Sequence, residues 1–281
     1  MPSAIGSINQ ARQLLLVISN HWKDQTGFMY LYDCPAPGQP WHLHAQFPIS
    51  LGRNGMAWGI GIYPRTPSKD PVKHEGDNCS PAGVFAIPTA FGYGSPPSGK
   101  ALAYPYLQLT ASTYGISDPD STLYNQIIDQ ARVTVRDWKS AETMRRRDDL
   151  YEMGFLVDHN PPHGPQHPAY GSCIFLHIWR APGSPTAGCT AMAKPSMIGL
   201  FSWINAEDKP VLVQLPRSEY VAVRDAWALP DVPQPAAFLS WPAIGLLCIF
   251  AMLVAMSCGA IRRRASLSRR DWTSGASVRQ A

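Results

Sequence analysis

Short apolar runs separated by turn-forming residues dominate the first 216 positions of the chain. Residues 12–20 (RQLLLVISN) predict a buried strand, and residues 27–33 predict a second one because aromatic residues recur there at every other position. By contrast, residues 52–61 are too rich in glycine for a regular element. The same pattern predicts further strands at residues 41–49, 84–87, 133–135, 155–159, 173–179 and 210–215.

Few segments have the spacing of a helix. Residues 120–131 are amphipathic, and Asp118 or Ser121 would cap the helix that they predict. Residues 140–150 predict a charged helix with a solvated face, and residues 196–205 predict an apolar one. Many short strands with few short helices therefore predict a mainly β, sandwich-like domain over residues 12–216.

The remaining segments flank this domain. Residues 1–11 form an N-terminal segment, residues 217–235 a proline-interrupted linker, and residues 236–261 an uncharged run that is long enough to cross a bilayer. Residues 262–281 form a tail with six arginines and one aspartate. Because basic residues favour the cytoplasmic side, we expect an inner-membrane protein whose domain is in the periplasm or extracytoplasmic space.

Export of such a domain normally needs a signal sequence, and residues 1–13 have no pattern of that kind. Two interpretations remain open. Either the chain starts elsewhere, or the apolar run is a tail anchor that leaves the domain inside the cell.

Charge and cysteine usage exclude several classes of protein. Outside the tail, 18 basic and 19 acidic residues leave the chain nearly neutral, which argues against a nucleic-acid partner. No CxxC pair occurs, so neither a zinc cage nor a thioredoxin motif is predicted. A disulfide between Cys34 and Cys79 stays open, because nothing in the sequence specifies the pairing.

The candidate chemistry lies in residues 174–192 (IFLHIWRAPGSPTAGCTAM). His177 ends an apolar run, and Cys189 follows a loop rich in proline and glycine, so a thiol nucleophile and its base are predicted. The turn Thr186-Ala187-Gly188-Cys189 offers backbone N–H groups for an oxyanion hole, and Gly188 permits close approach. A helix that starts soon afterwards would favour the thiolate of Cys189.

This region resembles the catalytic domain of the L,D-transpeptidase family, the YkuD type, in which a His precedes an S/T-x-G-C motif. Thr186, Gly188 and Cys189 match that motif, and His177 matches the upstream His. Residues 73–83 (KHEGDNCSPAG) resemble a stretch of the family with an E-G-D core. Further resemblance is found at residues 137–146, 157–160 and 171–177, so that it covers roughly residues 12–216.

The sequence also departs from the family pattern around the nucleophile. Ala187 replaces a common His, Thr190 and Ala191 replace an aliphatic residue followed by Arg or Asn, and the spacing from His177 to Cys189 is short. The resemblance therefore carries over the nucleophile and the base, but no second His and no Arg after the Cys.

The resemblance implies peptidoglycan chemistry that requires no metal and no cofactor. Cys189 would form a thioester with a stem tetrapeptide and release D-Ala, and an amine would then accept the acyl group, in cell-wall remodelling and the maintenance of cell shape. Arg180 is a candidate for holding a substrate carboxylate, and a surface ion pair is its alternative role. Weaker candidates are Arg145 or Arg146 for a carboxylate, Glu75 and Asp77 for the substrate amine, and Asp158, His159 and Asn160 for orienting His177.

Three alternatives remain open from the sequence. Water as acceptor would make the protein an L,D-carboxypeptidase, and loss of turnover would leave a membrane-tethered, wall-binding domain. A zinc peptidase is suggested by His159, His163 and His167, which recur every four residues, although the prolines among them oppose a helix. The acyl acceptor and the oligomeric state are not predicted.

Overall fold

An unbroken apolar run, residues 14–18, becomes part of a central strand. β1 (Gln13–Ser19) is buried along its whole length and lies between two other strands. It pairs in parallel with β14 (Val211–Pro216) and antiparallel with β2 (Thr26–Asp33). Burial of each Leu, Val or Ile side chain stabilises the fold by about 1.5–3 kcal/mol.

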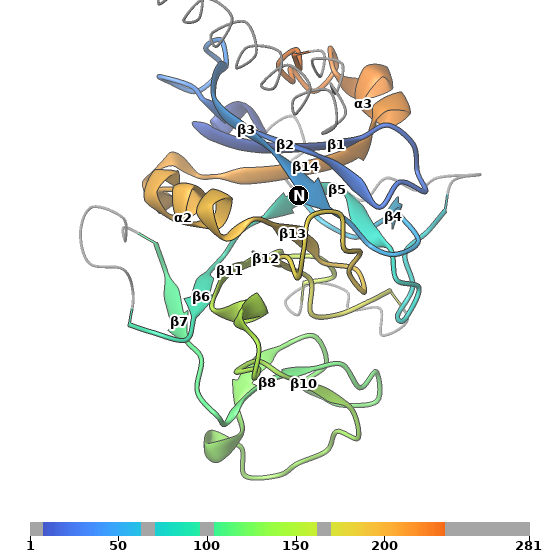
Figure 1. Cartoon of the computed structure of the whole chain (residues 1–281), viewed down its shortest axis with the longest axis vertical. Helices are drawn as coiled ribbons and strands as arrows, with labels where there is room; N and C mark the ends of the chain where they lie inside the picture. Colours follow the sequence, from blue (N-terminus) through green and yellow to red (C-terminus); the bar gives the residue numbers. More distant parts are fainter. Residues whose placement is uncertain (1–7, 63–70, 96–103, 162–169, 234–281) are drawn as a thin grey trace, which may run out of the picture. The chain divides into compact units, whose positions relative to one another are not determined.

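The computed structural model describes residues 8–62, 71–95, 104–161 and 170–233. These residues are mainly β with few helices, as the sequence predicts (Figure 1). Those up to Asp231 belong to one compact unit. No helix of the described part has both the length and the apolar character that crossing a bilayer requires. The predicted membrane helix (236–261) and basic tail (262–281) lie outside the described residues.

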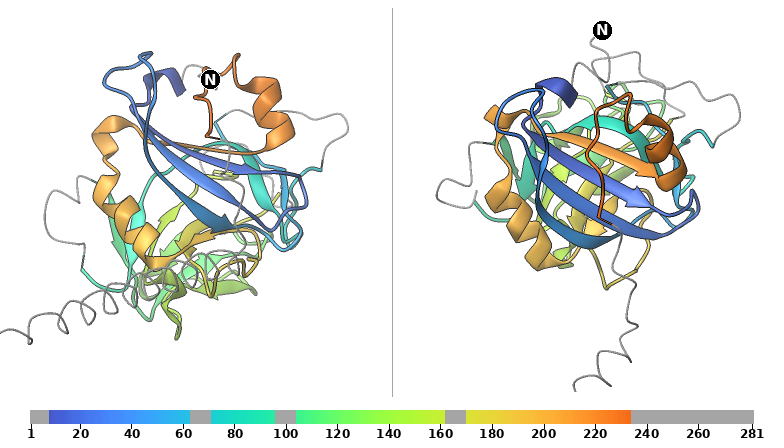
Figure 2. Two further views of the ribbon diagram at one scale, coloured as in Figure 1. Left: turned by 45° about the horizontal axis from the view of Figure 1, so that its top comes forward. Right: turned by 90° about the horizontal axis from the view of Figure 1, so that it is seen from above.

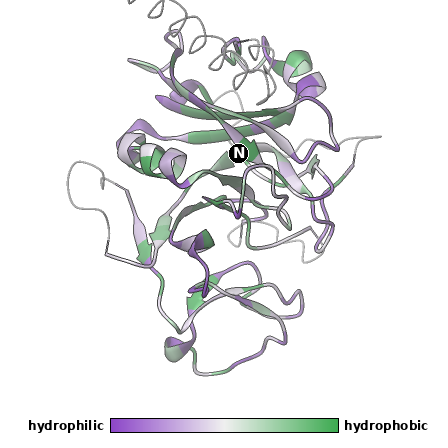
Figure 3. Cartoon of the chain, viewed as in Figure 1, coloured by the Kyte–Doolittle hydropathy of each residue, from purple (hydrophilic) through white to green (hydrophobic). Residues whose placement is uncertain are grey.

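Most of the described strands join one large sheet. The predicted strands at residues 12–20, 27–33, 41–49, 84–87, 155–159, 173–179 and 210–215 all have counterparts in it. Besides β1, β2 and β14, it contains β3 (His42–Ser50), β4 (Met56–Trp58), β5 (Ser80–Ala86), β6 (Ala90–Gly92), β7 (Tyr106–Gln108), β11 (Met153–Leu156), β12 (Phe175–Ile178) and β13 (Thr190–Met192). The order is β4-β5-β14-β1-β2-β3-β13-β12-β11-β6-β7. Hydrophobic colouring follows these strands in Figure 3.

Four three-residue strands of this sheet, β4, β6, β7 and β13, lie where none is predicted. The glycine-rich residues 52–61 contain β4, which pairs in parallel with β5 and is fully buried. Gly55 adopts a positive φ of 80° directly before this strand. A Cβ there would lie 2.0 Å from the carbonyl oxygen of Trp22, so the glycine permits a close approach of two backbones.

Two helices pack against different strands of the large sheet (Figure 2). α2 (Lys194–Trp203) confirms the predicted helix and packs against β11 and β12. α3 (Arg217–Val223) packs against β14 and β1, although the sequence predicts a linker over these residues. The segment after α3 is tied back to the unit, because Tyr220 donates its hydroxyl to the carbonyl of Pro230 at 2.7 Å and Tyr32 donates to that of Asp231 at 2.8 Å.

A small three-stranded sheet replaces the predicted helix over residues 120–131, the strand over 133–135 and the charged helix over 140–150. Its strands are β8 (Thr113–Ile116), β9 (Ile127–Asp129) and β10 (Ala141–Thr143), in the order β10-β8-β9 (Figure 1).

Side-chain hydrogen bonds explain why these predictions are wrong. The Asp118 carboxylate accepts the backbone N–H groups of Asp120 and Lys139, which folds the segment into turns. Asn125 adopts a φ of 60°, which interrupts the right-handed helical path. Farther along, Arg146 binds both carboxylate oxygens of Asp148, at 2.8 and 3.0 Å, within a loop.

Candidate active site

Sheet pairing brings the predicted base and nucleophile onto neighbouring strands. β12 and β13 run in parallel, with His177 beside Ala191 and Leu176 beside Thr190. Cys189 lies directly before β13. The backbone N–H of Phe175 contacts its sulfur at 3.4 Å, so the pairing of the two strands places the thiol.

The thiol of Cys189 is buried and electrostatically constrained. The residue is 8% exposed, and its sulfur donates weakly to the carbonyl of Cys173 at 3.6 Å. Burial, followed by the negative charge of Glu142, raises the pKa of Cys189 to about 12. The N–H of Phe175, the ammonium of Lys73 and the hydroxyl of Tyr151 act in the opposite direction. At neutral pH the resting site therefore holds a thiol.

His177 has the protonation state that a base needs. Its Nδ1 lies 2.8 Å from the carbonyl oxygen of Ile178. A carbonyl only accepts, so Nδ1 carries the proton and Nε2 has a free lone pair. The residue is 6% exposed, and burial lowers its pKa to about 4. The imidazole is therefore neutral at physiological pH.

Cys189 and His177 line the same cleft, which has a volume of about 710 Å³. In the described part of the chain no hydrogen bond joins the two side chains, because each is bonded to backbone groups instead. Such contacts often form only when substrate is bound. The geometry thus brings the predicted pair together without a preformed dyad.

Tyr151 is a site residue that the sequence reasoning missed. It is the last residue of a single 3-10 turn, η3 (Asp149–Tyr151), and it is 4% exposed. Its hydroxyl donates to Glu142 at 2.7 Å, and its ring meets that of His177 edge-on with centroids 5.2 Å apart. The Arg146 guanidinium lies 5.1 Å above the same ring and 3.4 Å from Glu142. These contacts attach the small sheet to the base and the nucleophile.

The turn before Cys189 is closed by its own side chains. The Thr186 hydroxyl accepts the N–H of Gly188 at 3.1 Å and donates to the carbonyl of Cys189 at 2.6 Å. Ser80 donates to that same carbonyl at 3.0 Å. The N–H of Gly188 is therefore occupied, contrary to the expectation that it serves an oxyanion. The N–H of Cys189 has no partner within the described residues, which leaves it available. β13 separates Cys189 from α2.

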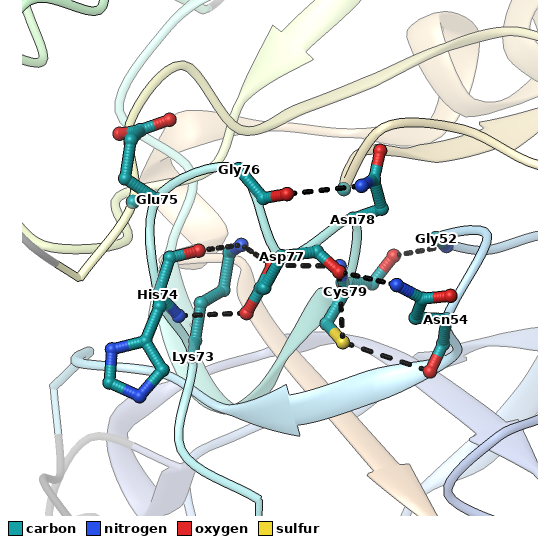
Figure 4. Close-up of polar contacts among 12 residues, drawn as sticks. Gly52, Asn54, Lys73, His74, Glu75, Gly76, Asp77, Asn78 and Cys79 are labelled. Atoms are coloured by element: carbon teal, nitrogen blue, oxygen red, sulfur yellow. Dashed lines mark hydrogen bonds and ion pairs between the residues drawn. The ribbon is translucent and has the colours of Figure 1, made fainter.

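A second loop, residues 73–80, packs against this turn. Lys73 is 3% exposed and forms an ion pair with Asp77, with 2.7 Å between Nζ and Oδ1. The Asp77 carboxylate also accepts the backbone N–H groups of His74 at 2.7 Å and Cys79 at 2.8 Å (Figure 4). Both Lys73 and Glu75 line the cleft, and Glu75 accepts the hydroxyl of Tyr124 at 2.6 Å.

The three arginine candidates differ in whether they lie at the cleft. Arg180 and Arg146 line the cleft, whereas Arg145 donates to the backbone carbonyls of Tyr93 and Leu109 and is not among the lining residues. The Arg180 side chain is 69% exposed and lies 3.6 Å from Asp148. Arg180 therefore lies at the cleft, as the role of carboxylate binding requires, and it also forms the surface ion pair of the alternative role.

Asp158, His159 and Asn160 are not among the residues that line the cleft. His159 is 2% exposed; its Nδ1 accepts the N–H of Ile60, and its Nε2 lies 2.9 Å from the carbonyl of Tyr170. Asn160 is fully buried and donates to the carbonyl of Gly171. Neither orients His177, whose Nδ1 is held by Ile178.

The structure bears on the zinc and disulfide alternatives through the histidines and cysteines that it describes. His163 and His167 lie outside the described residues, and the described part contains no cluster of three or more metal-ligating side chains. Cys34 and Cys79 are both free thiols, as are Cys173 and Cys189.

No protein-family model matches the sequence, and no curated protein matches it either. The residues of the cleft are therefore the basis on which its chemistry is assigned.

Proposed function

We propose that the protein is a cysteine-dependent L,D-transpeptidase of the YkuD type that acts on peptidoglycan. The main support is that Cys189 shares one cleft with a neutral His177 whose tautomer is set by the carbonyl of Ile178. The T-x-G-C motif and the upstream His resemble those of the L,D-transpeptidase family, and this resemblance is the basis for proposing peptidoglycan stem peptides as substrate. The membrane anchor and the extracytoplasmic position of the domain belong to the same proposal.

In the first half-reaction, Nε2 of His177 accepts the thiol proton as the sulfur attacks. The substrate carbonyl joins the L-centre of a diamino acid to the terminal D-Ala of a stem tetrapeptide. A carbon–sulfur bond forms, and the carbonyl electrons become an oxyanion that the N–H of Cys189 can receive. When the tetrahedral species collapses, the carbon–nitrogen bond breaks, D-Ala takes the proton from His177, and a thioester remains.

In the second half-reaction, an amine replaces D-Ala. His177 accepts its proton as the nitrogen attacks the thioester, and the thiol is regenerated when the carbon–sulfur bond breaks. A second stem peptide gives a cross-link, and a free D-amino acid gives exchange. Arg180, beside Asp148 at the cleft, is the candidate for a substrate carboxylate.

A catalytically weak wall-binding domain is the second candidate. The raised pKa of Cys189 and the lack of a preformed hydrogen bond to His177 are the observations that favour it. L,D-carboxypeptidase activity is a variant of the first candidate, in which water takes the place of the amine.

Incubation of the full-length protein with disaccharide-tetrapeptide, followed by mass spectrometry, tests these candidates. Release of D-Ala with a cross-linked dimer indicates a transpeptidase, and release with tripeptide alone indicates a carboxypeptidase. We expect product from wild type and from Cys34→Ser, which changes a buried thiol elsewhere, and none from Cys189→Ser. Neither product from folded wild type, together with no carbapenem adduct at Cys189, would refute both enzymatic functions.

A further inference from the structure

Residues 73–80 have no role in the mechanism so far, yet they pack against the nucleophile turn (residues 186–189). Ser80 holds the carbonyl of Cys189 with its hydroxyl, and it accepts the N–H of Gly52 at 2.9 Å. The carbonyl oxygen of Cys79 lies 3.1 Å from the position of a Cβ on Gly188. This loop therefore packs directly against the residues that carry the thiol.

Lys73 is the charged residue that this loop directs inward. An ammonium has three N–H groups. One binds the carboxylate of Asp77 at 2.7 Å, and one makes a long contact of 3.4 Å with the carbonyl of His74. The third has no partner in the described part of the chain. Lys73 is nevertheless almost completely buried and lines the cleft.

Two glycines with positive φ make room for this ammonium. Gly171 has a φ of 103°, and a Cβ on it would lie 3.3 Å from Nζ of Lys73. Gly188 has a φ of 150°, and its Cβ position is 3.7 Å from the same atom. The ammonium thus lies close to the residue that directly precedes Cys189.

The two charges of the Lys73–Asp77 ion pair are compensated to different extents by their surroundings. The Asp77 carboxylate is bonded on its other side to the N–H groups of His74 and Cys79, which offset part of its negative charge (Figure 4). The Lys73 ammonium has no comparable set of acceptors, so its positive field extends toward the nucleophile turn. In a buried site, with an effective dielectric constant well below that of water, such a field is weakly screened.

We propose that Lys73 is a fixed positive charge beside the nucleophile, which stabilises the negative charge on the sulfur of Cys189 and on the oxyanion that follows. The oxyanion part rests on the proposed function, whereas the effect on the sulfur does not. Lys73 exchanges no atom with the substrate. Its part in lowering the pKa of Cys189 agrees with this role. The K-H-E-G-D segment then places one cation beside the thiol, and Asp77 holds that cation in place.

Several other groups face the thiol and enter any pH profile of Cys189. Glu142 opposes ionisation of the sulfur, while Tyr151 favours it. Cys173 and His177 line the same cleft. Arg146 and Arg180 line the cleft as well and are positively charged, whereas Lys73 is the cation that packs against Gly188, directly before the thiol.

The test compares Lys73→Met, which removes the charge, with Lys73→Arg, which keeps it. Full-length protein is treated with iodoacetamide between pH 6 and 10, and peptide mass spectrometry gives a rate for each cysteine. We expect Lys73→Met to slow alkylation of Cys189 about tenfold at pH 8, which corresponds to one pKa unit. Lys73→Arg should recover most of the wild-type rate and pH profile.

The other thiols serve as internal controls. Lys73 also lowers the pKa of Cys79, so the alkylation rate of Cys79 should fall in Lys73→Met as well. The alkylation rate of buried Cys34 should not change. Misfolding would instead accelerate alkylation of Cys34 and Cys173. Equal Cys189 rates in wild type and folded Lys73→Met would overturn the proposal, as would a Cys189 that stays unlabelled up to pH 10.

Carbapenem acylation separates the two parts of the proposal, because only acylation creates an oxyanion. A larger loss of acylation than of alkylation in Lys73→Met supports the oxyanion role, and equal losses contradict it. Absence of a carbapenem adduct in wild type contradicts the proposed function and the oxyanion role. The effect of Lys73 on the thiol would still be decided by the alkylation rates.

Discussion

Tyr151 packs its ring edge-on against His177, with centroids 5.2 Å apart, while its hydroxyl donates to the Glu142 carboxylate. One side chain therefore connects the base on the large sheet with an acid on the small sheet. Since the same hydroxyl lowers the pKa of Cys189, Tyr151 contributes to the reactivity of the nucleophile as well as to packing.

Replacing Tyr151 by Phe should slow alkylation of Cys189 and leave the packing of the ring intact. Loss of the hydroxyl removes one group that favours the thiolate and leaves a half-buried Glu142 without that partner, at a cost of about 1–3 kcal/mol. We expect an alkylation rate about threefold to tenfold lower at pH 8.

Tyr104→Phe is the matched control for that variant. It removes a buried hydroxyl that donates to the backbone carbonyl of Ile87, and Tyr104 does not line the cleft of Cys189. It should reduce the free energy of unfolding and leave the Cys189 rate unchanged. A similar loss of rate in both variants would mean that Tyr151 acts only through stability.

Stability should fall as the pH is lowered from about 6.5 to 4. Burial lowers the pKa of both His177 and His159 to about 4, so in this window the unfolded state binds more protons than the folded state. Each histidine contributes up to about 3 kcal/mol that is present above pH 6.5 and fully lost below pH 4.

Urea unfolding at intervals between pH 4 and 8 measures this slope. His177→Gln removes one titrating group and should remove about half of the decrease that the two histidines cause. A slope that is the same in His177→Gln and in wild type would show that His177 titrates normally in the folded protein.

Gly188→Ala should impair both stability and the thiol. At a φ of 150° an alanine is strained, and its Cβ would lie 3.1 Å from the carbonyl oxygen of Cys79. We expect a loss of about 1–3 kcal/mol in the free energy of unfolding and a displaced Cys189 that is alkylated at a different rate. Gly38→Ala controls for backbone strain, since Gly38 also has a positive φ but nothing lies within 4 Å of a Cβ there.

Thr186→Val should loosen the nucleophile turn. The valine keeps the shape of the side chain but removes the hydroxyl that bridges the N–H of Gly188 and the carbonyl of Cys189. Each lost hydrogen bond is worth about 1 kcal/mol. In calorimetry Thr186→Ser should restore the wild-type melting temperature, whereas a valine variant as stable as wild type would show that Ser80 alone holds the turn.

The longer strands of the large sheet could be predicted because each has a local sequence pattern, whereas its three-residue strands β4, β6, β7 and β13 could not. The unbroken apolar run of β1 and the alternating aromatics of β2 have the period of a strand, and burial reinforces the same choice. The small sheet could not be predicted, since residues 120–131 have a helical pattern that long-range hydrogen bonds override. The bond from the N–H of Lys139 to Asp118 spans 21 positions and is invisible to any short window.

The residues of the candidate site also fall into two groups, those that the sequence predicted and those that it did not. Cys189, His177 and Thr186 are close in sequence and carry a recognisable motif, so the cleft that they line could be anticipated. Tyr151 and Lys73 reach the thiol from distant segments, and no local pattern signals that they do. For Lys73 the only signal was the resemblance of its segment to the family stretch with an E-G-D core.

The position of β13 has a consequence for the order of events during synthesis. This strand, which directly follows Cys189, lies in the sheet between β3 and β12, and β3 precedes it by about 140 positions. Pairings over such separations form late in folding, because a long loop must close first. A nascent or truncated chain that ends before Cys189 and β13 lacks both the nucleophile and the strand that places it. The reactive centre is therefore assembled only when the domain is nearly complete.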